Sequence, residues 1–297
     1  GMHNTSVNEA GFLASADGNT PHETVVRNGK IHTSPMEGEE QALHWLTVIG
    51  PAGGINSTVT DMMQWCRLHL SDGVVDGDTL LSAAQLAYLH RGQLITSQTD
   101  SKTNIYAPCW FVEQNSRYRV WFHTGTTWGF TAICAFVPEL QLGLMWLSNC
   151  EPPSDPRYAI MRHVIDHYLE LPAKDYSAEA LEQFLANALE REKKEQQELA
   201  GRIAEPSAPY AEYTGIYDHP SMGEAVITLE NGALYIALGP EDFPGRKHLM
   251  THVNGETFRF RSGGAAFSLK FMMEDHLLTF DLDLKQNENM GLWRARK

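Results

Sequence analysis

Hydrophobic and polar positions alternate most regularly between residues 118 and 150. β-Branched and aromatic side chains recur at every second position across Arg119–Thr124, Phe130–Val137 and Gly143–Ser148. A period of two is typical of a half-buried β-strand. Three such segments joined by short connections predict an antiparallel meander, with Pro138–Gln141 as its second turn.

The first connection of this meander, Gly125–Gly129, differs from an ordinary turn. It places two glycines around small hydroxyl side chains. Glycine has no Cβ, so backbone amides in such a connection can approach a ligand closely. We therefore expect a glycine-rich loop here, beside a strand that ends in His123 and Thr124, and we interpret this end of the sheet as the candidate catalytic edge.

Helical signals surround the meander. The residues at 57–70 begin with a Ser-Thr pair typical of a helix N-cap, and Asp61 in the first turn supports a helix through about Leu70. Ser82 and Gln85 have the spacing of a capping box, which predicts a second helix. Apolar side chains spaced three or four residues apart predict a third helix over 155–171. Helices flanking antiparallel strands indicate an α+β domain.

The pattern changes towards the C-terminus. Residues 177–200 read as a solvated connecting helix, because their second half is almost entirely charged or amide-bearing. From Tyr210 the period becomes two, with Asn-Gly turn dipeptides at 231–232 and 254–255. About eight short strands in so few residues favour a closed antiparallel barrel, which leaves no sheet edge exposed. The predicted organisation is a first domain at 1–172, a helical linker at 173–209 and a barrel at 210–297.

Composition limits the partners. The 297-residue chain has a formal net charge of −14, which argues against nucleic acid or an anionic membrane as its main partner. No apolar run of about 18 residues is present, so no membrane span is predicted. The histidines show no metal-ligand spacing, so neither a metal site nor another cofactor is expected. Four cysteines are interpreted as buried free thiols, although a disulfide between two of them stays open for an oxidising compartment; they are Cys66, Cys109, Cys134 and Cys150.

Several segments carry a family resemblance. The triplet His123-Thr124-Gly125 is followed by Trp128-Gly129-Phe130 and, at the end of the meander, by Leu147-Ser148-Asn149. Together with the segment AGGINSTVTDMMQW, which contains the start of the predicted helix, these segments resemble the serine β-lactamase and penicillin-binding-protein superfamily, specifically its class C-like branch with D-aminopeptidases, esterases and D,D-peptidases. The order of segments matches that branch throughout residues 1–172. Residues 210–297 look like the β-barrel module often appended to it.

The resemblance implies a fold and a set of site residues. The expected fold is part of a β-lactamase or transpeptidase-like domain, followed by a lipocalin-like barrel. His123 would supply a cationic or hydrogen-bonding group, although an ordinary strand histidine is the alternative. Thr124 would orient a substrate carboxylate or amide, Gly125 completes the triplet, and Thr126 would give its backbone N–H to an oxyanion. Trp128 would line the substrate cleft, unless it belongs to the core or rim.

The resemblance also exposes a gap in the chemistry. The superfamily acylates a serine in a Ser-x-x-Lys motif with help from Tyr-x-Asn. In this sequence no serine is followed three positions later by lysine, and no tyrosine two positions later by asparagine. Losing a nucleophile costs on the order of 10⁶ in rate, whereas one oxyanion donor contributes only about 10²–10³. We therefore expect a portion of a hydrolase domain that is inactive by itself.

Two function classes stay open. The first is part of a serine hydrolase that acts on a small molecule or peptide with a D-amino acid, a β-lactam or an ester. The second is a non-catalytic module that binds peptides or cell-wall fragments. The family's habit implies a periplasmic or secreted protein. A half-domain would leave apolar surface uncovered, so a homodimer or association with an N-terminal fragment is expected.

Overall fold

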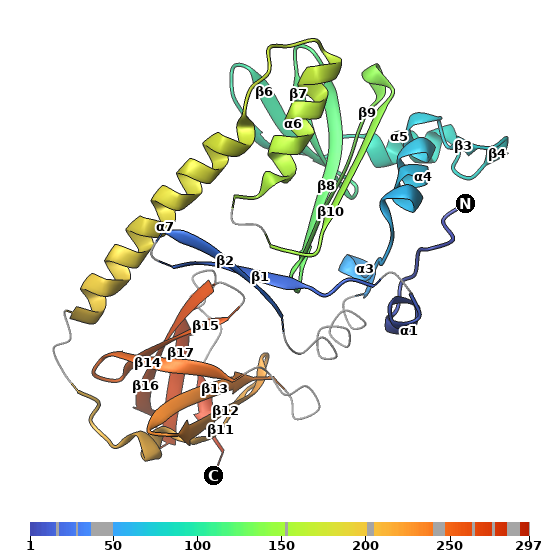
Figure 1. Cartoon of the computed structure of the whole chain (residues 1–297). Helices are drawn as coiled ribbons and strands as arrows, with labels where there is room; N and C mark the ends of the chain where they lie inside the picture. Colours follow the sequence, from blue (N-terminus) through green and yellow to red (C-terminus); the bar gives the residue numbers. More distant parts are fainter. Residues whose placement is uncertain are drawn as a thin grey trace. The chain divides into compact units, whose positions relative to one another are not determined.

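The computed structural model of the protein forms two compact units, residues 1–185 and 186–297. It describes residues 1–15, 18–27, 29–36, 50–151, 154–200, 205–239, 247–262, 265–274, 277–283 and 292–296. The boundary between the units falls inside a long helix, α7 (Tyr176–Ala200). Each unit is described by itself (Figure 1).

The first unit is built on a six-stranded antiparallel sheet with the order β10-β9-β8-β7-β6-β5. The strands follow one another along the chain as an extended meander, so every connection is a short turn. Their bounds are β5 Leu94–Gln98, β6 Lys102–Ala107, β7 Trp110–Asn115, β8 Arg119–Thr127, β9 Phe130–Val137 and β10 Leu142–Ser148. One 3₁₀ turn, η1 (Pro138–Leu140), joins β9 to β10 and ends at Gln141 in the left-handed region, with φ 48°.

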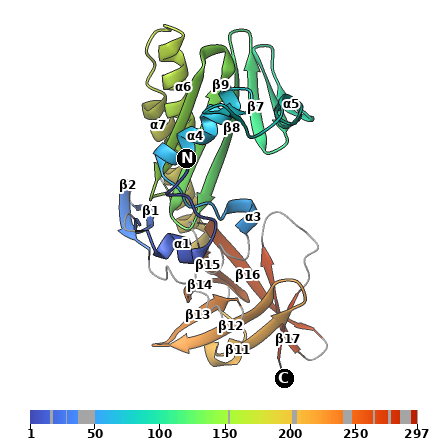
Figure 2. The ribbon, with the colours of Figure 1, turned by 90° about the vertical axis from the view of Figure 1, so that its right-hand side faces the viewer.

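The two faces of this sheet are covered by different helices (Figure 1 and Figure 2). Side chains alternate between the faces of a strand, so Phe122 and Ile133 pack with α6 (Pro156–Tyr168), whereas Trp121 and Phe136 share a core with α4 (Val59–Leu70). The alternating pattern that predicted the meander therefore arises because successive side chains pack into two separate cores, one on each face of the sheet.

The helix caps form as the sequence predicts. The Thr58 hydroxyl accepts from the Asp61 amide at 3.2 Å and starts α4. Ser82 and Gln85 make the reciprocal capping box of α5 (Ala83–His90). Such a cap stabilises a helix by about 1 kcal/mol, which fixes where each helix begins.

Smaller elements precede the sheet. They are α1 (Glu9–Leu13), the hairpin of β1 (His22–Arg27) and β2 (Lys30–Pro35), α3 (Gly50–Gly53), and the short pair β3 (Val74–Val75) and β4 (Asp78–Thr79). The hairpin pairs His22 with Pro35 at one end and Arg27 with Lys30 at the other, and Asn28 lies outside the described residues. The His22 amide donates to the Asn149 carbonyl at 2.8 Å, so β1 is anchored where β10 ends.

The second unit is a closed antiparallel barrel of eight strands, β11 to β18. A 3₁₀ turn, η2 (Tyr210–Tyr213), leads into it. The strands are β11 Gly215–His219, β12 Gly223–Glu230, β13 Ala233–Leu238, β14 His248–Asn254, β15 Thr257–Ser262, β16 Ala265–Glu274, β17 Leu277–Asp283 and β18 Trp293–Ala295. Pairing of Tyr217 with Ala295 closes the ring, and aromatic side chains such as Phe258, Phe280 and Trp293 fill it.

The predicted α+β fold and the barrel of about eight strands are confirmed. One local prediction was wrong. Residues 125–127 continue the β8 strand, so the expected five-residue loop is a two-residue turn. Pro108 and Cys109 form the β6–β7 turn, with Cys109 at φ 66°.

Among the helices that the structure describes, none has the length and apolar character to cross a membrane.

Candidate functional site

The turn between β8 and β9 is the centre of the candidate site. Thr127 pairs with Phe130, and the two residues between them, Trp128 and Gly129, both have positive φ, 40° and 75°. This is the geometry of a type I′ hairpin turn, whose twist matches that of the strands it joins. Gly129 is required here twice over, because a Cβ would also meet the His22 backbone at 2.9 Å.

Arg157 of α6 binds the end of β8 and holds it in place. Its guanidinium donates to the Gly125 carbonyl at 2.8 Å and to the Thr126 hydroxyl at 2.9 Å. A second fork of N–H groups binds the Asp155 carboxylate, and this hydrogen bond raises the pKa of Arg157 above its ordinary value. The Thr126 side chain therefore serves to hold the strand.

The register leaves the backbone of β8 accessible along one side, which we call the free edge and define by the N–H groups of Thr124 and Thr126. The β7–β8 ladder ends at the Phe111–Phe122 pair. The two-residue turn makes Thr127 and Phe130 the first hydrogen-bonded pair of the β8–β9 ladder. The backbone N–H groups of residues 125 and 127 therefore point towards β9, and those of residues 124 and 126 point away from it. No strand in the described part of the chain pairs with residues 124–126 on that side.

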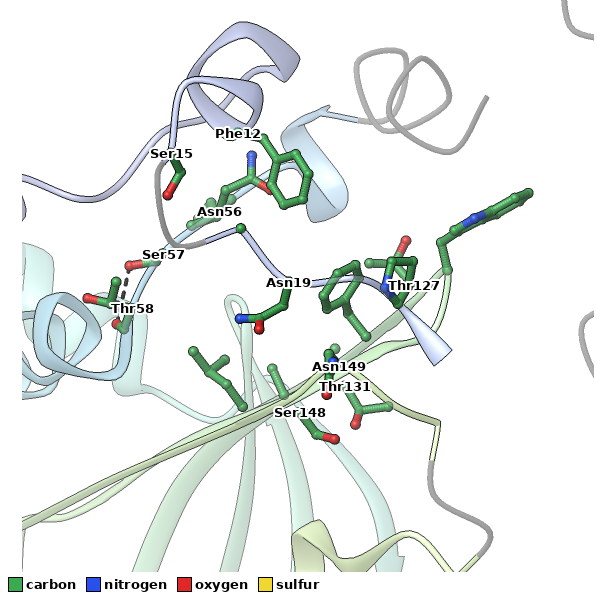
Figure 3. A pocket seen from close by; sticks show the side chains of 18 of the residues that line it. Phe12, Ser15, Asn19, Asn56, Ser57, Thr58, Thr127, Thr131, Ser148 and Asn149 are labelled. Carbon is green, nitrogen blue, oxygen red and sulfur yellow. Dashed lines mark hydrogen bonds between the residues drawn. The ribbon is translucent and has the colours of Figure 1, made fainter. Parts of the chain in front are cut away.

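A cavity of about 560 Å³ lies beside this end of the sheet. Its walls come from α1 and the residues after it, the segment between α3 and α4, the β8–β9 turn and the end of β10 (Figure 3). Aromatic side chains line part of it, namely Phe12, Trp128, Phe130 and Trp146. Hydroxyl and amide side chains line the rest, and none of the described lining residues carries a charge. The size suits a small ligand.

A chain of hydrogen bonds runs from the cavity to a buried carboxylate. Ser57 lines the cavity, and its hydroxyl lies 2.8 Å from the Thr5 hydroxyl. Thr5 donates to Asp61 Oδ2 at 2.8 Å, and the Asn4 amide donates to the same oxygen at 2.7 Å. Asp61 is only 3% exposed, so these donors stabilise its charge away from water. Figure 3 shows Ser57 and Thr58 at the end of the cavity opposite Thr127.

The structure brings some of the predicted residues together and separates others. Gly125 and Trp128 line the cavity, and a Cβ on Gly125 would meet only Ala132 Cβ, at 3.9 Å. Thr124 and Thr126 lie on the free edge, with the Thr126 hydroxyl turned to Arg157. His123 is exposed and is not among the lining residues; its Nδ1 lies 2.8 Å from the Thr124 carbonyl and its ring 5.4 Å from that of Phe111. The catalytic roles of the four residues stay predictions.

Sequence reasoning missed most of the cavity. Ser57 was predicted as part of a helix cap, whereas Thr58 alone caps α4 and Ser57 turns to the cavity. Thr127 was treated as loop, but its hydroxyl is buried and has no hydrogen-bond partner among the described residues. The signal for Ser57 was present: two consecutive hydroxyl residues precede the helix, and only one can be its N-cap.

No group of three or more His, Cys, Asp and Glu side chains is close enough to hold a metal ion within the described ranges.

Comparison with known families agrees with this geometry. A family model described as Beta-lactamase matches residues 1–168, which is more than half of the 297-residue chain. The chain belongs to the beta-lactamase family. A second model, a domain of unknown function called DUF3471, matches residues 200–293. The family match covers the sheet, the free edge and the cavity, and the second match covers the barrel.

Solved structures resemble this beta-lactamase family member only distantly. One is the octameric penicillin-binding protein homologue from Pyrococcus abyssi, at 13% identity and a TM-score of 0.45, covering 100% of this chain and 57% of that one. Another is SurE, at 15% identity and a TM-score of 0.40, covering 95% and 56%. The C-terminal domain of a penicillin-binding protein matches 32% of this chain and 91% of its own length, at 24% identity and a TM-score of 0.27. The chain thus spans a little over half the length of the octameric homologue and of SurE.

Proposed function

We propose that residues 1–185 form the substrate-binding side of an acyl-transfer site in a serine hydrolase that acts on amide or ester bonds. The observation that carries the proposal is the position of the free edge: Thr124 and Thr126 present backbone N–H groups where β7 has ended, next to a cavity lined by Gly125 and Trp128. Backbone donors fixed in a strand need no reorganisation when charge develops on a substrate oxygen.

Each element of the site has a place in this proposal. The Thr126 N–H would bind the oxyanion, a role that depends on the backbone alone. Arg157 would keep that N–H in position, since it binds the Gly125 carbonyl and the Thr126 hydroxyl. Gly125 would leave room for the acyl group in the cavity. His123 would approach the substrate from the exposed side of the strand. The finer assignment, to the class C-like branch with D-aminopeptidases and with a lipocalin-like barrel, belongs to this proposal as well.

The chain by itself is expected not to turn over substrate, because the sequence has neither Ser-x-x-Lys nor Tyr-x-Asn. The test is incubation with a chromogenic cephalosporin, D-alanine p-nitroanilide and a p-nitrophenyl ester, with Ser57→Ala as the matched variant at the cavity. We expect background hydrolysis from both proteins. Turnover that disappears when Ser57 is changed would show a nucleophile in this chain and overturn the proposal.

A non-catalytic module that binds peptides or cell-wall fragments is the second candidate. The observation in its favour is the cavity itself, which combines aromatic walls with hydroxyl and amide groups and so suits binding without chemistry. The two candidate functions differ in whether they need the backbone N–H of Thr126. Removing the Thr126 N–H with Thr126→Pro should leave simple binding in the cavity unchanged, whereas Thr126→Ala keeps the N–H and serves as the control.

Self-association is part of the same proposal. Val7 and Leu13 are each 65% exposed, and Ile55 beside the cavity is 63% exposed. Contiguous apolar patches are typical of an interaction surface, and these three side chains would belong to one. We expect light scattering at micromolar concentration to give a mass above that of one chain. A clean monomer mass would contradict this part.

A further inference from the structure

The described residues that line the cavity are neutral. Carboxylates lie behind two parts of its wall: Asp61 lies behind Ser57 and Thr5, and Glu151 accepts from the Gly129 amide at 3.1 Å. Arg157 binds the adjacent end of β8 at Gly125 and Thr126, but Asp155 neutralises it through two hydrogen bonds. A ligand carboxylate would therefore lose its water and meet no unpaired cation from the described lining.

The Ser57 hydroxyl is oriented by the chain of hydrogen bonds behind it. A carboxylate only accepts, so Thr5 must give its one proton to Asp61. The Thr5 oxygen is then free to accept, and Ser57 donates to it at 2.8 Å in preference to the Thr58 carbonyl, which lies farther away at 3.4 Å. The Ser57 proton thus points away from the cavity, and its lone pairs remain for a ligand that donates a hydrogen bond.

The opposite end of the cavity offers a different group. The Thr127 hydroxyl is buried and makes no hydrogen bond to any described residue, although it can donate one and accept two. Buried polar groups in native proteins are nearly always paired, so this hydroxyl marks a place where a ligand atom or water completes the site. Phe130 and Trp128 line the same end and offer apolar contact.

We propose that the cavity binds a small ligand in which an aromatic or branched apolar group carries an N–H donor and no carboxylate, namely an arylalkyl amine or the corresponding amide. The N–H group donates to Ser57, and the apolar group packs against the aromatic wall. The proposal rests on the proposed function only because both use this cavity, and it narrows the substrate to one whose acyl or leaving group is not anionic.

The test is calorimetric titration of the full chain with three probes of matched size at pH 7: 3-phenylpropylamine, 3-phenylpropanamide and 3-phenylpropanoate. Binding in the millimolar range is typical of ligands this small. We expect the amine and the amide to bind at least about tenfold more tightly than the acid, since the acid meets no unpaired cation on the described wall. Equal or tighter binding of the acid, or binding of none of the three, overturns the proposal.

Two variants connect the result to the residues. Thr5→Val keeps the shape of the side chain and breaks the connection to Asp61, so the preference for amine over acid should fall severalfold; Thr96→Val on the exposed strand β5 is the control and should not change it. Gly125→Ala adds one methyl group to the wall and should weaken the amine and the amide together. An unchanged preference in Thr5→Val contradicts the orientation of Ser57. If that variant does not fold, Ser57→Ala tests the same point.

Failure here is distinct from failure of the proposed function. The probes report binding without turnover, so a hydrolytic chain could still show the expected preference. A chain that prefers the acid would lose this inference while the oxyanion role of the free edge stayed intact.

Discussion

Arg157 holds Thr126 in place: its guanidinium donates to the Thr126 hydroxyl at 2.9 Å and to the neighbouring Gly125 carbonyl at 2.8 Å. The helix α6 and the end of β8 are thus joined by one side chain, only 12% of which is exposed. A sheet end without a strand partner on one side would otherwise fray. The connection explains how a backbone edge can be both accessible and rigid.

Replacing this arginine should loosen the site. Hydrogen bonds to charged groups contribute about 1.5–3 kcal/mol each, of which part is recovered by water. We expect Arg157→Met to lower the free energy of unfolding by about 1–3 kcal/mol in urea titration. Arg162→Met is the control, because Arg162 lies on the same helix but makes only a 3.8 Å ion pair with Glu113. Equal losses in both variants would mean that Arg157 acts through general helix stability.

Backbone exchange should reveal the free edge directly. The register predicts that the amides of Thr124 and Thr126 face away from β9, whereas those of Gly125 and Thr127 are bonded to it. We expect the first two to exchange with deuterium much faster than the second two in NMR-detected hydrogen exchange. Thr131 and Ile133 of the central strand β9 provide the slow reference. Slow exchange at Thr126 would show that something covers the edge and would remove it as an oxyanion donor.

The stability of the first unit should depend on pH through His69. This histidine is 3% exposed, its Nδ1 lies 2.8 Å from His90 Nε2, and its ring packs among those of Trp110 and Phe136. Burial, and then repulsion from His90, lower its pKa from 6.5 to about 4. The unfolded chain takes up this proton below pH 6.5 and the folded chain only near pH 4, so the stabilising contribution is complete above pH 6.5 and is lost as the pH falls towards 4.

The pKa difference corresponds to about 3 kcal/mol. We expect the pH slope of unfolding between pH 6.5 and 4 to be shallower in His69→Phe than in the parent protein. His163→Gln serves as the control because His163 is exposed on α6. Titration of the His69 ring by NMR with a midpoint near 6.5 would contradict the prediction.

The sequence revealed the periodic parts of the fold and little of the cavity. Alternation located β9 and β10, and spacing located the capping box of α5, because both depend on neighbours close in the sequence. The cavity depends on contacts across long separations, such as Thr5 with Asp61 and Asn149 with the Thr20 carbonyl. No local pattern encodes which residues will meet in that way.

Local chemistry also misled at the β8–β9 turn. Two glycines around threonines suggested an irregular loop. Of the two glycines only Gly129 has a positive φ, and the other turn residue with a positive φ is Trp128. Gly125 sits in regular strand, where open space beside it is the feature that matters. The family resemblance directed attention to this end of the sheet by its motif, which does not depend on local propensity, and the catalytic role of its residues stays a prediction.

The barrel should depend on its closing strand. Trp293 of β18 is 1% exposed and stacks on Phe280 of β17, with ring centroids 5.1 Å apart and an interplanar angle of 8°. Truncating a buried aromatic side chain costs about 3–5 kcal/mol. We expect Trp293→Ala to lower the unfolding midpoint of the barrel unit strongly. Tyr88→Ala, at a side chain 57% exposed, should change stability by less than about 0.5 kcal/mol. A small effect of Trp293→Ala would mean that β18 does not close the barrel.

The four cysteines should differ in reactivity according to where the fold places them. Cys109 is exposed in the β6–β7 turn, which corrects the expectation that all four thiols are buried, and Cys150 is half-buried. Cys66 and Cys134 face each other across α4 and β9 with their Sγ atoms 3.6 Å apart; the Cys66 thiol and burial raise the pKa of Cys134. Thiolate is the reactive form, so burial and a raised pKa both slow attack.

With an aromatic disulfide reagent at pH 8 we expect Cys109 to react first, and Cys134 only after addition of denaturant. Mass mapping of the labelled peptides measures the order, Cys109→Ser should remove the fast phase, and early labelling of Cys134 would show that α4 leaves the sheet.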